Sequence, residues 1–396
     1  MGTFTPKIPP CSIPMQTRYQ KTIKRIAWIG AAFTAYSEDA PGSVADCLNQ
    51  YVQGLRKLNV HSTLILPPGS KSVHHHVVVV GELQPSMLVA SRTNETQSAL
   101  QNMVDWAWEH QSQFDLIVNL GHDYLPHSMI GKFQTPFISI PNMGKASPQL
   151  DALVQQRAKQ YPKNIWFFSK AQRSYLGVED NPIINQGFNV EHFPLATAVK
   201  SGASLAWAGR IVPEKGLEAA LKIAQALKIK LNVAGSLDDP QYFAQLQSKF
   251  PKHLVEWDYL GNLPRDLLFS MLHSSRALLQ TQEPLWAEAF GRVTAEALLC
   301  GCPVLYTDCG ANDEIVRSVD GGFQVGSDTP QNVMQLIGLQ TRGTIQEKAK
   351  SLFGQIPVAR RFLAQAQDLF YPEKSHPLSD IAKEVPAKDS LNPIPA

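Results

Sequence analysis

The stretch LWAEAFGRVTAEALLCGCPVLYT, residues 285–307, decides how the rest of the chain is read. Its middle is rich in helix formers, and it predicts a helix that begins near Gly291. Gly301 and Pro303 end that helix, and the apolar run 304–307 predicts a buried strand directly after it. This order of elements indicates an α/β domain.

Two glutamates bracket the start of this helix. Glu288 lies just before it and Glu296 about one and a half turns inside it, so the two carboxylates cannot form a side-by-side acid/base pair. The free N–H groups and the positive dipole of a helix N-terminus bind phosphate, and Gly291 lets a diphosphate approach the backbone closely. Two acids on opposite sides of a diphosphate fit the layout of a nucleoside diphosphate sugar.

Residues 288–296, EAFGRVTAE, followed by 297–304, ALLCGCPV, resemble the E-x7-E signature of glycosyltransferase family 4, retaining enzymes of the GT-B fold. The resemblance implies that Glu288 holds the sugar hydroxyls and Glu296 the ribose. It also places Phe290, Gly291 and Val293 against the donor. The alternative interpretation is an amphipathic helix whose two glutamates are only solvated.

Two positions of the signature depart from the family. Ala289 replaces a common Gly or Pro, and Arg292 stands where an aliphatic residue is frequent. Arg292 either adds a phosphate contact or faces solvent, and we adopt the phosphate contact, which makes Arg292 a predicted substrate-binding residue.

A second match lies in residues 205–216, LAWAGRIVPEKG, which predict a strand, a loop and the start of a helix. Arg210 offers a bidentate fork and Lys215 a point charge, and the pair suits a diphosphate. In the resembled family this Arg and Lys bind phosphate. The same resemblance makes Gly261 and Asn262 contacts of the nucleobase. Two cations on a solvated loop are the alternative for Arg210 and Lys215.

The amino-terminal part resembles the family less closely. Gly42 and Ser43 stand where the family has a glycine-rich loop that faces the donor phosphates and the acceptor. His122 follows the predicted strand 115–120, and ligands bind at that edge of an open parallel sheet. The resemblance implies a histidine there near the donor sugar and the acceptor, so we prefer His122 to His127 as a catalytic residue. A loop-capping histidine is the alternative.

A chain of 396 residues exceeds the usual size of a single core. The predicted fold class is α/β, GT-B, with two Rossmann-like domains facing across a cleft and a C-terminal helix returning to the first domain. The predicted parts are an extended arm (1–20), an acceptor domain (21–197), a donor domain (203–359), the returning helix (360–372) and a proline-rich tail (373–396). Further strands are predicted at 136–140, 164–169 and 276–281.

Composition narrows the functional classes. A net charge of +2 gives no reason to expect nucleic acid as a partner. The absence of a long apolar run predicts no transmembrane segment or secretory signal, although the basic arm leaves a peripheral contact with an anionic surface open. Five cysteines without disulfide or metal spacing favour a cytoplasmic protein. No Asp-x-Asp pair occurs, and His74–His76 is read as an exposed turn leading into a hairpin, so we expect neither metal nor cofactor.

The predicted function is transfer of a sugar from a UDP-, GDP- or ADP-sugar co-substrate to a hydroxyl of an unidentified acceptor, with retention of configuration. Arg210, Lys215 and the helix start near Gly291 would stabilise the leaving diphosphate. Glu314 is expected to cap or pack locally. The alternatives are an epimerase or phosphorylase on the same fold, and a nucleotide-sugar-binding protein without turnover.

Overall fold

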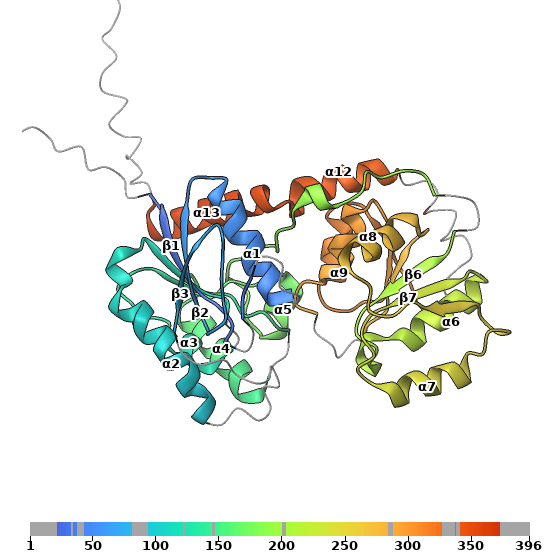
Figure 1. Ribbon diagram of the computed structural model, residues 1–396, viewed down its shortest axis with the longest axis horizontal. Helices are drawn as coiled ribbons and strands as arrows, with labels where there is room; N and C mark the ends of the chain where they lie inside the picture. Colours follow the sequence, from blue (N-terminus) through green and yellow to red (C-terminus); the bar gives the residue numbers. More distant parts are fainter. Residues whose placement is uncertain are drawn as a thin grey trace, which may run out of the picture.

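The computed structural model has two α/β domains joined side by side (Figure 1). It describes residues 22–32, 35–37, 43–80, 94–121, 123–144, 147–199, 203–283, 288–326, 337 and 341–372. The predictions for the arm, the tail, Gly42 and His122 therefore lie outside the described residues. The side chain of Ser43 does so as well, although its backbone begins a helix.

The first domain is built on a five-stranded parallel sheet. Its strands are β1 (Arg25–Ile29), β2 (His61–Leu66), β3 (His76–Val79), β4 (Leu116–Asn119) and β5 (Phe137–Ser139), in the order β3-β2-β1-β4-β5. The inner strands β1 and β4 are almost continuously apolar because helices cover both faces of a parallel sheet. The carboxyl ends of all five strands consequently point to one edge.

Helices cover both faces of this sheet. Trp28 of β1 packs against α1 (Ser43–Arg56) and α13 (Gln355–Phe370), whereas Ala27 and Ile29 share a core with α2 (Asn94–Glu109) and α4 (Pro148–Gln160). The alternation of side chains along a strand explains this division. The short helix α3 (Tyr124–Ser128) follows β4, and α5 (Lys170–Tyr175) and the 3-10 turn η3 (Val190–His192) come after β5 in the chain. The 3-10 turn η2 (Gln111–Gln113) precedes β4.

The second domain repeats the plan with six parallel strands. They are β6 (Leu205–Ala208), β7 (Leu231–Ala234), β8 (Trp257–Tyr259), β9 (Leu278–Gln280), β10 (Val304–Tyr306) and β11 (Gly322–Gln324), in the order β11-β10-β9-β6-β7-β8. Helices α6 (Leu217–Leu227) and α7 (Pro240–Lys249) cover one face. Helices α8 (Arg265–Ser274), α9 (Arg292–Leu299) and α12 (Arg342–Phe353) belong to the core on the other face, and η4 (Pro213–Lys215) and α10 (Asn312–Arg317) complete the described elements.

The last helix returns to the first domain, as predicted. Helix α12 lies against α9 of the second domain, and α13 lies against α1 of the first (Figure 1). Phe362 of α13 is fully buried, with its ring centroid 5.7 Å from those of Trp28 and Tyr51 and 5.3 Å from that of Trp166. This aromatic cluster holds α13 against the first domain.

Two strand predictions are wrong. Residues 164–169 form no strand, and contribute only single bridges from Ile165 to Ser139 and from Phe167 to Ile183. The side-chain oxygen of Gln172 accepts the N–H of Phe168 at 2.8 Å, so that N–H does not join a ladder. Residues 74–79 form no hairpin either, because β3 pairs in parallel with β2.

None of the described helices combines the length and apolar composition needed to cross a bilayer. In the same part of the chain, no group of three or more His, Cys, Asp or Glu side chains is arranged to hold a metal ion.

Candidate functional site

The predicted site residues of the second domain follow neighbouring strands at one edge of its sheet. Glu288 follows β9, Lys215 follows β6, and Gly261 follows β8, with Gly235 after β7 between them. The N–H of Gly235 donates to the carbonyl of Gly261 at 2.9 Å. A Cβ on Gly235 would lie 1.7 Å from the carbonyl oxygen of Gly209, so the loops can pack this closely only because this residue is glycine. The edge spans about 14 Å from β9 to β8 at the usual strand spacing.

Lys215 and Glu288 meet at this edge although 73 residues separate them. The Nζ of Lys215 lies 2.6 Å from Oε2 of Glu288, and the two side chains are 16% and 22% exposed. The hydroxyl of Thr281 donates to the carbonyl of Gly216 at 2.7 Å, which ties the loop after β6 to the segment after β9. The fold thus brings this cation and this acid together, and their roles in donor binding remain predictions.

Glu288 is held in place from the following loop. A Cβ on Gly310, whose φ is +57°, would lie 2.6 to 2.8 Å from three atoms of Glu288. The N–H of Ala311 donates to the carbonyl of Glu288 at 3.2 Å. Sequence reasoning did not predict this positioning contact.

The helix start behind Glu288 has no side-chain cap. Helix α9 begins at Arg292 as predicted, and its N-cap Gly291 has a φ of +73° and makes no side-chain cap hydrogen bond. Val293 follows in the first turn, where N–H groups lack partners within the helix. The hydroxyl of Thr294 donates to Oδ1 of Asn312 at 2.7 Å and fixes this turn against α10. The motif did not indicate the contributions of Thr294 and Asn312.

Phe290 does not line the site with its side chain. Its ring is 2% exposed and lies between the domains, 6.3 Å from the ring of Phe188 and 5.9 Å from that of Phe353 by centroid. A large apolar ring gains more from this burial than from a polar cleft. Any contact of Phe290 with a ligand would have to come from its backbone.

Arg210 is the more exposed of the two predicted phosphate-binding cations. Its side chain is 47% exposed, and its guanidinium lies 3.5 Å from Asp238 and 3.8 Å from Glu214. Both contacts are weak enough at this exposure to be exchanged for a phosphate. The role of Arg210 remains a prediction.

Gly261 and Asn262 follow the edge strand β8. Gly261 has a φ of +78° and open space beside its Cα, and Asn262 is exposed. This placement brings them to the same edge as Lys215, two strands away. It agrees with the geometry expected of a base contact, which itself remains a prediction.

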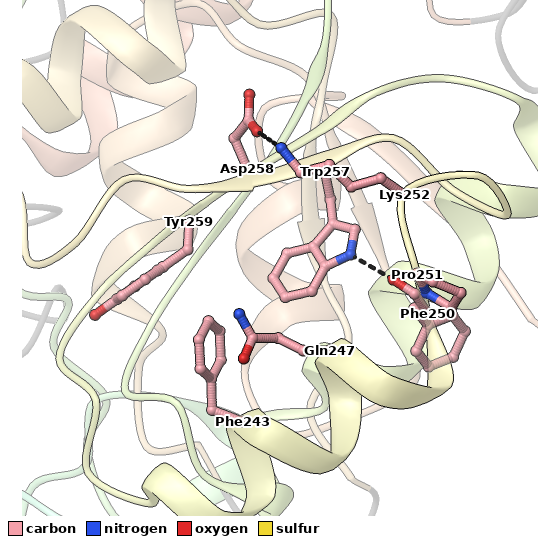
Figure 2. A pocket seen from close by; sticks show the side chains of 8 residues that line it. All are labelled: Phe243, Gln247, Phe250, Pro251, Lys252, Trp257, Asp258 and Tyr259. Atoms are coloured by element: carbon pink, nitrogen blue, oxygen red, sulfur yellow. Dashed lines mark hydrogen bonds and ion pairs between the residues drawn. The ribbon is translucent and has the colours of Figure 1, made fainter.

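A groove of about 410 Å³ lies between α7 and β8 (Figure 2). Its lining includes Phe243, Gln247 and Trp257, and none of the predicted site residues belongs to it. The indole N–H of Trp257 donates to the carbonyl of Phe250 at 2.8 Å, and Lys252 pairs with Asp258 at 2.9 Å. Because these polar groups already have partners within the protein, the groove is a weaker candidate for a ligand site than the sheet edge that carries Lys215 and Glu288.

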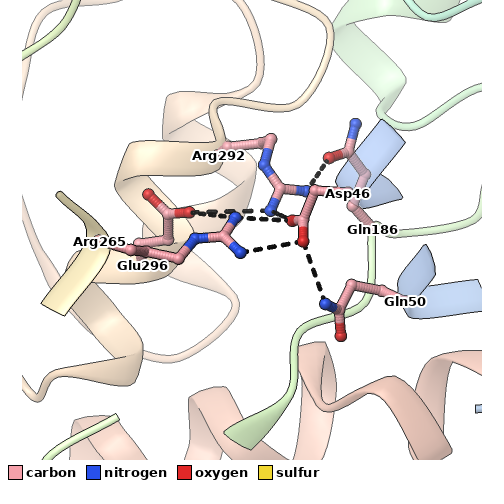
Figure 3. Close-up of polar contacts among 6 residues, drawn as sticks. All are labelled: Asp46, Gln50, Gln186, Arg265, Arg292 and Glu296. Carbon is pink, nitrogen blue, oxygen red and sulfur yellow. Dashed lines mark hydrogen bonds and ion pairs between the residues drawn. The ribbon is translucent and has the colours of Figure 1, made fainter. Parts of the chain in front are cut away.

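Glu296 faces the first domain within a cluster of charges (Figure 3). Arg265 and Arg292 of the second domain converge there on Asp46 of α1. Arg265 forms a bidentate pair with Asp46 at 3.0 and 2.8 Å, and Arg292 contacts Asp46 and donates to Oε1 of Gln186 at 2.8 Å. The guanidinium of Arg292 therefore neither faces solvent nor points along α9 to the open helix start. Its predicted phosphate contact is untested, and sequence reasoning missed Asp46, Gln186 and Arg265.

Burial and charge act in opposite directions on the two acids. Burial raises the pKa of Glu296, and the attraction of Arg292 and Arg265 only partly offsets it. Burial also acts to raise the pKa of Asp46, but Arg292 and Arg265 outweigh it and lower that pKa overall. Asp46 is consequently the acid that the two arginines stabilise as an anion.

The first domain contributes a buried polar chain at the carboxyl ends of β4 and β5. The amide of Asn119 donates to Oγ of Ser139 at 2.8 Å, and that Oγ lies 2.8 Å from Nδ1 of His127. His127 is fully buried, and burial lowers its pKa to about 4. His127 is thus a neutral structural imidazole in this chain, and the role of His122 stays a prediction.

Comparison with known proteins identifies the second half of the chain. Residues 198–339 match the family described as Glycosyl transferases group 1. The second domain is a glycosyl transferases group 1 domain. Among curated proteins, the sequence search finds no match.

Solved structures extend the likeness over both domains. A glycosyltransferase involved in avilamycin A biosynthesis is 22% identical with a TM-score of 0.67, over 87% of this chain and 98% of that chain. Sucrose-phosphate synthase from Thermosynechococcus elongatus is 19% identical with a TM-score of 0.64, over 88% and 99%. HepE from Anabaena, solved with UDP and glucose, is 16% identical with a TM-score of 0.61, over 87% and 100%. The chain has the predicted GT-B fold.

Glu314 of the second domain also contacts the first domain. Its two carboxylate oxygens accept the N–H of Lys170 at 2.9 and 3.0 Å. Glu314 thus caps the start of α5, a helix of the other domain. Glu314 was expected to cap or pack locally; it does cap a helix, but that helix lies in the other domain, 144 residues away in the sequence.

Proposed function

We propose that the protein is a glycosyltransferase that moves a sugar from a nucleotide-sugar donor to a hydroxyl of an acceptor, with retention of configuration. The observation that carries this proposal is the contact of Lys215 with Glu288 beside the uncapped start of α9. The contact lies in a glycosyl transferases group 1 domain.

The chemistry follows from the charges at this edge. A leaving diphosphate gains negative charge as the bond to the sugar breaks. Lys215, Arg210 and the N–H groups at the start of α9 are cationic or dipolar donors held in place before the reaction, and such donors stabilise a developing charge strongly. These donors come from the chain itself, so we propose a reaction that does not depend on a metal ion.

The acids take the two ends of the donor in this proposal. Glu288 exchanges Lys215 for a sugar hydroxyl when the lysine turns to the phosphate. Glu296 accepts hydrogen bonds from the ribose, and the loop of Gly261 and Asn262 contacts the base. Closure of the first domain over the donor would exclude water and limit hydrolysis.

UDP-glucose is the first donor to test, because HepE has been solved with UDP and UDP-glucose. GDP- and ADP-sugars complete the panel. Release of nucleoside diphosphate that depends on an added acceptor supports transfer. Conversion of the donor alone would indicate an epimerase, a response to orthophosphate would indicate a phosphorylase, and binding without turnover would indicate a binding protein.

Three variants test the site itself. Lys215→Ala and Glu296→Ala should each weaken donor binding about tenfold or more, because each removes a hydrogen bond to a charged group. Glu288→Gln should lower kcat more than it weakens binding of the bare nucleoside diphosphate. Lys230→Ala is the matched control, since Lys230 pairs with Asp258 at 2.6 Å at the outer edge of the same domain. Unchanged kinetics in all three site variants would refute the assignment.

A further inference from the structure

We propose that Asp46 of the first domain is a positioning residue for nucleotide binding. It holds Arg292 beyond hydrogen-bond distance of Glu296, whose side chain is 7% exposed, and so leaves the carboxylate oxygens of Glu296 available to the ribose hydroxyls. This inference rests on the proposed function, in which Glu296 binds the ribose.

Glu296 and Arg292 are natural partners on one helix. They stand four residues apart on α9, a spacing at which Glu and Arg side chains pair readily. Their closest oxygen and nitrogen are nevertheless 3.7 Å apart, which is too long for a hydrogen bond. Something therefore draws the guanidinium of Arg292 away from its neighbour.

The first domain supplies that attraction. Arg292 contacts the carboxylate of Asp46 and donates to Gln186 at 2.8 Å, and its guanidinium lies 4.6 Å from the ring centre of Phe188. All three partners belong to the first domain. The side chain of Arg292 is only 12% exposed in this position.

Arg265 behaves in the same way. Both of its terminal nitrogens bond to Asp46, while its distance to Glu296 is 3.9 Å. Asp46 also accepts the side-chain N–H of Gln50 at 3.2 Å. Asp46 thus takes the hydrogen bonds of both guanidiniums, and neither reaches Glu296 within hydrogen-bond distance.

The charges of this cluster balance as two arginines against two acids. Removing the charge of Asp46 would leave Arg292 largely buried beside an uncharged amide, which is costly. Glu296 is then the nearest acid and sits at the favourable helical spacing. A direct pair of Arg292 with Glu296 would occupy the oxygens that the ribose needs.

A purely structural role for Asp46 makes a different prediction. If Asp46 only joined the domains, its loss would weaken binding of every nucleotide alike. If it positions Glu296, its loss weakens only the part of the affinity that comes from the ribose hydroxyls. The ratio of the affinities for UDP and for 2′,3′-dideoxy-UDP measures that part.

Calorimetric titration of the full chain with these two compounds tests the inference. We expect wild type to prefer UDP by about tenfold, the value of a hydrogen bond to a charged group. Glu296→Gln should lose this preference. Asp46→Asn should lose it to the same extent while binding dideoxy-UDP as wild type does, and Asp46→Glu should retain it.

The double variant Asp46→Asn/Arg292→Gln separates the two roles further. It removes one charge of each sign and takes away Arg292, which lies nearer to Glu296 (3.7 Å) than Arg265 does (3.9 Å), so part of the preference for UDP should return. This variant also carries the test if Asp46→Asn alone does not fold. Glu218→Gln is the matched control, because Glu218 bridges Lys222 and Lys249 on the outer surface, both at 2.7 Å.

Two results would overturn the inference. One is an unchanged preference for UDP in Asp46→Asn, and the other is a preference that stays lost in the double variant. The proposed function fails separately, if wild type binds none of the nucleotides or if Glu296→Gln keeps the preference for UDP.

Discussion

At the scale of single residues, the position of Glu288 depends on a residue without a side chain. Gly310 has a φ of +57°, and a Cβ there would lie 2.6 Å from the backbone nitrogen of Glu288. Alanine at this position would be strained in its own backbone and would displace Glu288 as well. The backbone of Glu288 has no room to yield without losing its bond from Ala311.

We therefore expect Gly310→Ala to lower kcat about tenfold or more, because small misplacements of a reacting group are costly. The affinity for the bare nucleoside diphosphate should change far less. Steady-state kinetics and nucleotide titration measure the two quantities. Gly343→Ala is the control, since no atom lies within 4 Å of its added Cβ. An unaltered kcat in Gly310→Ala would show that Glu288 is not positioned from this loop.

Single residues also show which contacts could be predicted from the sequence and which could not. Lys215, Glu288 and Gly291 could be assigned to one edge of the sheet because each belongs to a motif with fixed spacing next to a strand end. Asp46 and Arg292 stand 246 residues apart, and neither carries a local signal of the other. Their pairing arises only when two domains dock.

At the scale of elements, α13 ties the end of the chain to the first domain. Phe362 is fully buried among Trp28, Tyr51 and Trp166. Truncation would leave a cavity between rings that cannot move together to fill it.

Phe362→Ala should therefore lower the free energy of unfolding by about 3–5 kcal/mol. Urea unfolding followed by tryptophan fluorescence reports this directly, because Trp28 and Trp166 border the cavity. The exposed Arg360 on the same helix provides the control Arg360→Ala, for which we expect little change. Equal stability of the two variants would mean that α13 does not anchor the first domain.

Elements were predicted best where the apolar pattern was long. The strands β4, β5, β9 and β10 lie within two residues of the predicted ranges 115–120, 136–140, 276–281 and 304–307. The three-residue strands β8 and β11 were missed, since each is defined by the neighbour it pairs with. The strand predicted at 164–169 was wrong for the opposite reason. Its composition is strand-like, but the side chain of Gln172 accepts the backbone N–H of Phe168 that a strand would use for pairing.

At the scale of the whole molecule, stability should depend on pH through His127. Burial lowers the pKa of this imidazole from 6.5 to about 4. The unfolded chain therefore binds a proton between these values while the folded chain does not. The contribution of His127 to stability is complete above pH 6.5 and declines as the pH falls toward 4.

Between pH 6.5 and pH 4 the contribution of His127 to the free energy of unfolding should fall by about 3 kcal/mol. Urea unfolding of wild type and His127→Asn at pH 7.5, 6 and 5 isolates it, because every other group titrates equally in both. Asparagine keeps a polar atom near Nδ1 for the hydrogen bond to Ser139. We expect the difference between the two proteins to shrink at lower pH, and a constant difference would show that folding does not shift the pKa of His127.

The two-domain plan followed from length and from two series of alternating strands and helices, but the contact between the domains did not. Glu314 was expected to act locally and instead caps α5 across the interface. The ring of Phe290 packs between the domains, and its contact with a ligand remains a prediction. Neither contact across the interface follows from the motifs, because a motif fixes spacing along the chain and not which surface the other domain will cover.

The chain passes between the domains twice, and the two passages lie together. The side chain of Gln346 accepts the N–H of Ala196 at 3.0 Å and donates to the carbonyl of Pro194 at 2.7 Å. Phe188 and Gly354 form a parallel bridge close by. Because these two backbone segments are paired on one side of the interface, they resist sliding and twisting of one domain against the other. Rotation of the domains about the line of this pairing is then the easiest motion. Any swing opens the far side first, where Asp46 meets its two arginines.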